Sequence, residues 1–119
     1  MNDFRKLEVW QLSKELTIDI YKITSKFPDA EKFGLINQIR RSSVSIISNI
    51  AEGSGRETNP DYLRFITIAL GSSYELDAQL EISFELNFIS KSDYDELNSK
   101  LISIKKMLYN FSKYLKSNN

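Results

Sequence analysis

Apolar residues recur at steps of three and four through most of this chain, a spacing that places them along one side of an α-helix. The clearest stripe lies near the C-terminal end and consists of Tyr94, Leu97, Leu101, Ile104, Leu108, Phe111 and Leu115. Such a seam is typical of helices that pack lengthwise against other helices. No alternating run of four or more residues with turn signals at both ends predicts a β-strand. The spacing therefore predicts an all-α protein.

Four segments carry this spacing, and short gaps separate them. We expect helices over about residues 5–25, 31–52, 60–88 and 93–116. Helices of similar length joined by short connections favour an antiparallel bundle with up-down-up-down topology. The whole chain, residues 1–119, is then one four-helix-bundle domain.

Local signals predict where these helices start and stop. Gly53 is placed to end the second helix in a left-handed conformation. Asn59 can cap the third helix, and Pro60 suits its first position. The three-residue spacing from Ser92 to Asp95 indicates a capping box at the start of the fourth helix.

The composition excludes much chemistry. The chain contains neither cysteine nor histidine, so disulfides, thiolate nucleophiles, Cys/His zinc sites and Ser-His-Asp triads are ruled out. Glu75, Asp77, Glu81 and Glu85 avoid the apolar stripe of the third segment, so nothing desolvates these carboxylates for acid–base work. We therefore expect no enzymatic activity, no catalytic residue, no metal, no cofactor and no small-molecule substrate.

Charge and hydropathy bear on partners and location. Sixteen lysines and arginines balance sixteen aspartates and glutamates, which argues against a protein dedicated to wrapping nucleic acid but leaves a local basic face open. The N-terminal residues lack the apolar run of a secretory signal, and the most apolar stretch, residues 65–70, is too short to span a bilayer. We expect a cytoplasmic protein that does not enter membranes.

The second segment has a polar side opposite its apolar one. The residues of interest on that side are Gln38, Arg41, Ser45, Asn49 and Glu52. Most polar sides are simply solvated. This one lacks lysine, and arginine with short polar groups suits fixed hydrogen bonds at an interface. A solvated face and a polar interface network are the two alternatives.

Three segments also carry a second, ordered set of apolar residues beside the main stripe. This set consists of Trp10, Tyr21, Leu63, Leu70, Tyr74, Ile102 and Tyr109. Scattered exposed apolar residues are ordinary, but ordered second stripes on several helices indicate a buried contact between subunits. The pattern predicts an oligomer without giving the number of subunits.

Dispersed strings at fixed spacing connect the chain with a known family. They include residues 4–10, 38–41, 49–53, 69–72 and 79–80, and the match extends from Phe4 to about Leu115. In these strings the chain closely resembles the small bacterial four-helix-bundle proteins encoded in intervening sequences of 23S rRNA genes.

The resemblance implies a homopentamer of four-helix bundles around an axial opening, with no enzymatic activity and no cofactor. Relatives in this family include an accessory protein of diversity-generating retroelements that binds nucleic acid and a reverse transcriptase. The strongly basic surface of that relative is not matched by this chain, whose net charge is zero.

Two functional hypotheses follow. The first is a non-enzymatic oligomeric scaffold or adaptor. The alternative is a module that binds RNA or DNA weakly, without sequence preference, through basic residues on the oligomer surface. Its candidate phosphate contacts are Arg40, Arg41, Arg56, Arg64, Lys105 and Lys106. Clustering of these cations on one exposed face would favour the alternative, and pairing with carboxylates would weaken it.

Overall fold

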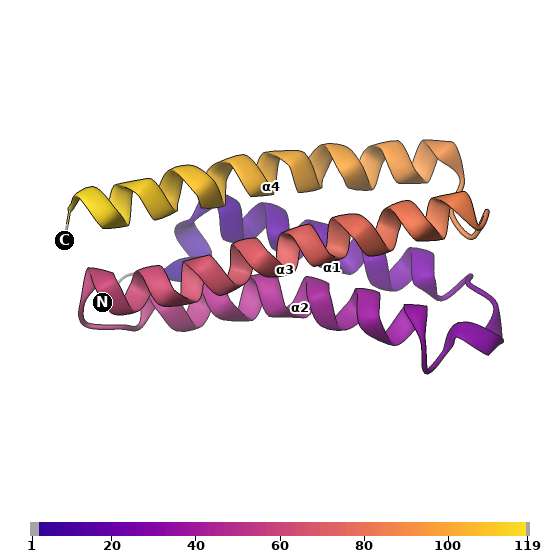
Figure 1. The fold of residues 1–119 in the computed structure, drawn as a ribbon, viewed down its shortest axis with the longest axis horizontal. Helices are drawn as coiled ribbons and strands as arrows, with labels where there is room; N and C mark the ends of the chain where they lie inside the picture. Colours follow the sequence, from indigo (N-terminus) through magenta and orange to yellow (C-terminus); the bar gives the residue numbers. More distant parts are fainter. Residues whose placement is uncertain (1–2, 119) are drawn as a thin grey trace.

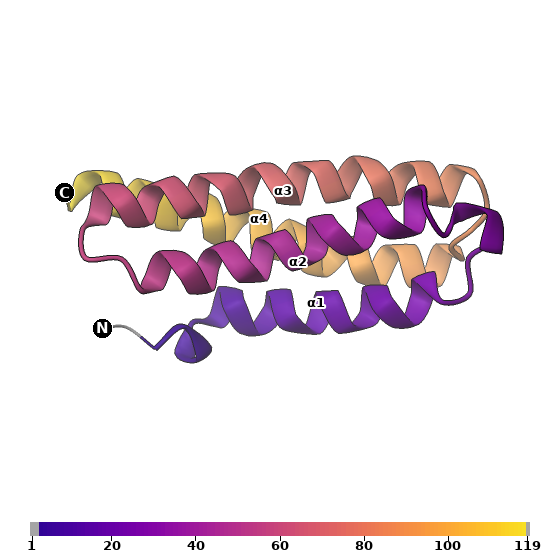
Figure 2. The ribbon, with the colours of Figure 1, turned by 90° about the horizontal axis from the view of Figure 1, so that it is seen from below.

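The computed structural model describes residues 3–118 and confirms the all-α, antiparallel four-helix bundle (Figure 1). The helices are α1 (Glu8–Thr24), α2 (Leu35–Ser54), α3 (Asn59–Glu85) and α4 (Lys91–Ser117). Each helix packs against two neighbours, because α1 contacts α4 as well as α2 and so closes the ring. The turn between α2 and α3, the start of α1 and the end of α4 all lie at one end of the bundle (Figures 1 and 2).

The predicted stripes face the interior. In α4 the central positions Leu97, Leu101, Ile104 and Leu108 are at most 1% exposed, and the same holds for Leu76 and Leu80 of α3. Burial of apolar side chains from all four helices in one cluster supplies the main driving force for folding. The spacing of three and four residues therefore identified the core directly.

Two helices begin later than predicted, because short 3-10 turns precede them. Phe4–Lys6 form one such turn before α1, with the Asp3 side chain accepting a hydrogen bond from the Arg5 backbone N–H. Asp29–Glu31 form the second before α2. The third helix ends at Glu85 rather than at about residue 88, because Asn87 adopts a left-handed φ of 64°.

Both predicted caps are displaced. Thr58, not Asn59, caps α3, and its hydroxyl accepts from the Asp61 N–H at 3.3 Å. Ser90, not Ser92, caps α4, and its hydroxyl accepts from the Asp93 N–H at 3.1 Å. Each correction moves the cap towards the N-terminus by one or two residues, to another side chain that can cap.

The prediction that Gly53 stops α2 is wrong. The helix continues to Ser54, and none of the glycines has a positive φ. Gly53 is buried where α3 crosses close to α2. A Cβ at this position would lie 2.8 Å from Tyr62 Cδ1 and 3.0 Å from Phe65 Cβ. Close packing of the two helices, rather than backbone conformation, requires glycine here.

Two ion pairs link α4 to its neighbours. Lys100 pairs with Asp19 of α1, and Lys105 Nζ lies 2.6 Å from Asp77 Oδ2 of α3. The hydrogen bond to Asp19 raises the pKa of Lys100 above its ordinary value. Both lysine side chains are less than a third exposed, so these pairs are better shielded from solvent than surface pairs. Within residues 3–118, no helix combines the length and apolar character needed to cross a membrane.

Candidate functional site

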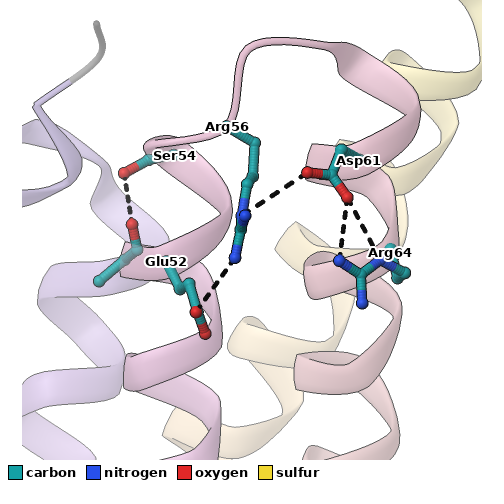
Figure 3. A network of polar contacts seen from close by, with 6 residues as sticks. Glu52, Ser54, Arg56, Asp61 and Arg64 are labelled. Carbon is teal, nitrogen blue, oxygen red and sulfur yellow. Dashed lines mark hydrogen bonds and ion pairs between the residues drawn. The ribbon is translucent and has the colours of Figure 1, made fainter.

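Two of the candidate phosphate contacts lie close to the turn between α2 and α3, Arg56 within the turn and Arg64 near the start of α3 (Figure 3). Arg56 lies between Glu52, 3.2 Å away, and Asp61, 3.6 Å away. Arg64 donates to the other oxygen of Asp61 at 3.0 Å. Both guanidinium groups also lie over the Phe65 ring, at 4.5 and 4.6 Å from its centre. The carboxylates neutralise this pair of arginines within the chain.

Two further candidates are also engaged within the chain. Arg40 Nε donates to Thr24 Oγ1 at 2.9 Å, and its guanidinium lies 4.5 Å from the centre of the Tyr21 ring. These contacts direct Arg40 towards α1. Lys105 pairs with Asp77 of α3, and its ammonium lies 5.0 Å from the centre of the Tyr74 ring. Neither cation is left free to meet a phosphate without giving up these contacts.

Among the six candidates, only Arg41 and Lys106 have no ion pair, hydrogen bond or ring contact through their side chains within residues 3–118, since Arg40 lacks an ion pair but is held by Thr24 and Tyr21. Both are exposed. Arg41 lies on α2 and Lys106 on α4, two helices that do not pack against each other. These two candidates therefore lie on separate faces of the bundle.

The polar side of α2 forms a hydrogen-bonded cluster only in part. Ser45 Oγ lies 2.8 Å from Ser72 Oγ of α3, and Asn49 Nδ2 donates to the Ser45 carbonyl at 2.8 Å. Glu52 turns to Arg56, while Gln38 and Arg41 are exposed. Burial of this side in a subunit contact stays a prediction. Ser72 lies in the family string 69–72, but the sequence did not predict it as a partner of the polar side of α2.

A polar cleft of about 420 Å³ lies between α2 and α3. Its walls include Phe33, Asn37, Arg41, Ser42, Glu75 and Gln79. The Ser42 hydroxyl is buried at the base and lies 2.9 Å from both Glu75 Oε1 and Gln79 Oε1. Gln38 and Ser45 also line the cleft, so three of the five residues of the predicted polar network meet there, together with Glu75 from the predicted row of acids. The others become neighbours through helix packing.

A second, more apolar groove of about 420 Å³ runs between α3 and α4. Its apolar walls are Tyr74, Ile102 and Tyr109, which are 58%, 43% and 55% exposed. These three residues belong to the predicted second stripes, and the packing of α3 against α4 brings them together. Lys105 and Lys106 border the same groove.

Within residues 3–118, no group of three or more metal-ligating side chains is gathered closely enough to hold an ion. Two of the surface clefts differ clearly in character. One is the polar α2–α3 cleft, and the other is the apolar α3–α4 groove.

A family model and a solved structure are both similar to this chain. The family model for the 23S rRNA-intervening sequence protein matches residues 5–110. No curated protein matches the chain. A crystal structure of a protein with unknown function from the S23 ribosomal protein family of Bacteroides thetaiotaomicron is similar, with a TM-score of 0.79 and 28% sequence identity. The similarity covers 88% of this chain and 98% of that one. The chain belongs to the 23S rRNA-intervening sequence protein family.

Proposed function

We propose that this protein is a non-enzymatic, oligomeric scaffold or adaptor. The observation that carries the proposal is the α3–α4 groove, in which three large apolar side chains from two helices are exposed together. Tyrosine and isoleucine side chains arranged in this way suit a desolvated contact with another protein surface. A second copy of the chain is the proposed occupant, and the family resemblance supplies the number five.

Native mass spectrometry at about micromolar concentration tests the assembly. We expect a species close to five times the subunit mass of 13.8 kDa. Ile102→Glu should shift the protein to smaller species, because it places a charge in a contact that excludes water. Ile18→Glu is the matched control, since Ile18 is 45% exposed on α1, outside the groove.

Two results would contradict this assignment. A wild-type protein that is monomeric at every concentration would refute the assembly. If Ile18→Glu and Ile102→Glu weakened the assembly equally, the contact would not lie in the α3–α4 groove. Circular dichroism of both variants checks that the helices remain folded.

We expect nucleic-acid binding, the alternative function, to be weak and independent of sequence. Four of the six candidate phosphate contacts are engaged within the chain, and the net charge is zero. A pentamer would still present five copies each of Arg41 and Lys106. Such contacts would give an affinity in the micromolar range or weaker at about 0.15 M salt, as is usual for non-specific binding.

Fluorescence anisotropy with single-stranded and duplex RNA and DNA measures this affinity. Titrations at about 50 and 200 mM salt give the salt dependence of the binding constant. In a plot of log K against log salt concentration, each neutralised phosphate of duplex DNA contributes about −0.9 to the slope. Nanomolar, sequence-selective binding that persists at the higher salt would contradict the scaffold proposal and support the alternative.

A further inference from the structure

The polar cleft between α2 and α3 carries one cationic and one anionic side chain that do not pair. Arg41 and Glu75 both line it, yet neither forms an ion pair within 4.0 Å among residues 3–118. Elsewhere in the bundle, Arg56 and Lys105 each pair with a carboxylate. The cleft therefore presents opposite charges on its α2 and α3 walls.

Hydrogen bonding at the base of the cleft leaves an acceptor short of a donor. Ser42 is 2% exposed and its Oγ lies 2.9 Å from both Glu75 Oε1 and Gln79 Oε1, but a hydroxyl has a single proton to donate. If the Gln79 amide is turned so that its NH₂ donates to Ser42, its carbonyl oxygen loses that partner instead. In either orientation the α3 wall offers acceptors to a ligand that brings N–H groups.

The mouth of the cleft adds an apolar surface. Phe33 is 88% exposed, the highest value among the exposed large hydrophobic residues of the bundle. It lies before the start of α2, where it borders the same cleft as Arg41 and Glu75. An aromatic ring left in water next to a polar cleft gains by contact with an apolar group of a ligand.

The charges select the class of ligand. A phosphate-bearing ligand would bring its negative charge next to Glu75, and a simple cation would lie beside Arg41; each like-charge contact is unfavourable. A zwitterion with no net charge can place its negative group beside Arg41 and its positive group beside Glu75. A volume of about 420 Å³ lies within the range of small-molecule sites.

We propose that this cleft binds a small zwitterion of the α-amino acid type with an apolar or aromatic side chain. Arg41 takes the carboxylate, Glu75 and Gln79 take the ammonium group, and Phe33 contacts the side chain. No residue of the α3–α4 groove lines this cleft.

Isothermal titration calorimetry of the full chain with L-phenylalanine and two analogues tests the assignment. Phenethylamine lacks the carboxylate and 3-phenylpropionate lacks the ammonium group. We expect L-phenylalanine to bind and each analogue to bind at least about tenfold more weakly, because each forfeits one charge-assisted contact. This comparison uses the unmodified protein, so it does not depend on the folding of any variant.

Two variants assign the contacts. Arg41→Gln should weaken L-phenylalanine binding by about tenfold or more and leave phenethylamine unchanged. Glu75→Gln, which can still accept from Ser42, should weaken L-phenylalanine and leave 3-phenylpropionate unchanged. Arg5→Gln and Glu81→Gln are the matched controls, since both side chains are exposed and outside the cleft. They should bind as the wild type does.

Three results would overturn the proposal. The first is no saturable binding up to about 10 mM L-phenylalanine, which corresponds to a binding free energy weaker than about −3 kcal/mol. The second is equal binding of all three compounds. The third is dissociation of the oligomer by Arg41→Gln in native mass spectrometry, which would show that a second copy of the chain occupies the cleft. Loss of assembly in Ile102→Glu alone would leave the proposal intact.

Discussion

Replacing Gly53 with alanine is expected to lower the free energy of unfolding by about 1–3 kcal/mol, although alanine is the better helix former. The new Cβ would lie 2.8 Å from Tyr62 Cδ1 and 3.0 Å from Phe65 Cβ, so α3 must move away from α2. Phe65 Cβ is attached directly to the backbone and cannot yield without moving the helix. Urea unfolding followed by circular dichroism measures the change.

Gly71→Ala provides the matched control. Gly71 also lies in a helix interior, but an added Cβ meets nothing within 4 Å. The same substitution should therefore raise the free energy of unfolding by about 0.5–1 kcal/mol, the usual gain over glycine. Unchanged stability in Gly53→Ala would contradict the close packing at the α2–α3 crossing. A loss in Gly71→Ala would show that another molecule covers this part of α3.

The second large effect concerns Tyr62 at high pH. Its side chain is 5% exposed, and its hydroxyl is buried without a hydrogen-bond partner in the described part of the chain. Burial raises the pKa of Tyr62 from 10.0 to about 12. Between these values the unfolded chain has lost the phenol proton while the native state keeps it, so the free energy of unfolding falls as the pH rises.

This loss of stability begins near pH 10, is nearly complete by about pH 12 and amounts to about 2–3 kcal/mol. Tyr62→Phe has no phenol to ionise and so escapes this loss. It also removes the unpaired hydroxyl, so this variant should be about 1 kcal/mol more stable at neutral pH. The stability difference between the two proteins should then widen towards pH 12.

The wild type must be compared with Tyr62→Phe because two other pKa values are raised as well. Burial raises the pKa of Tyr94, and the hydrogen bond to Asp19 raises that of Lys100. These groups are common to both proteins and cancel in the difference. Absorbance of tyrosinate during a pH titration gives an independent reading, since one tyrosine of the wild type should ionise last. A constant stability difference between pH 8 and 12 would contradict the assignment to Tyr62.

Helix identity and core membership could be read from the chain because both follow from local periodicity. A stripe such as Leu97, Leu101 and Leu108 lies on one side of any helix that contains it, and burial of that side follows whichever neighbours it meets. The all-α class and the four-helix bundle were therefore accessible without a structure.

Helix ends were less accessible, because neighbouring residues offer equivalent caps. Ser90 and Ser92 are each followed three residues later by an aspartate, so local pattern alone does not choose between them. The buried Ile89 just before Ser90 shows that packing of the preceding loop decides where α4 starts. The prediction for Gly53 was wrong for a similar reason. A glycine near a helix end is compatible both with termination of the helix and with a close crossing of two helices.

The residues that form the candidate binding surfaces were harder to predict from the sequence than the helix ends, because they are brought together only in the tertiary structure. Whether a cation is free depends on which carboxylate a neighbouring helix places beside it, and Lys105 finds Asp77 across the α3–α4 contact. The polar cleft likewise brings Ser42 into contact with Glu75 and Gln79, which are separated from it by 33 and 37 positions in the chain. Periodicity specifies which side of each helix is buried, but the rotation and axial offset between packed helices set these pairings, and both result from interlocking side chains.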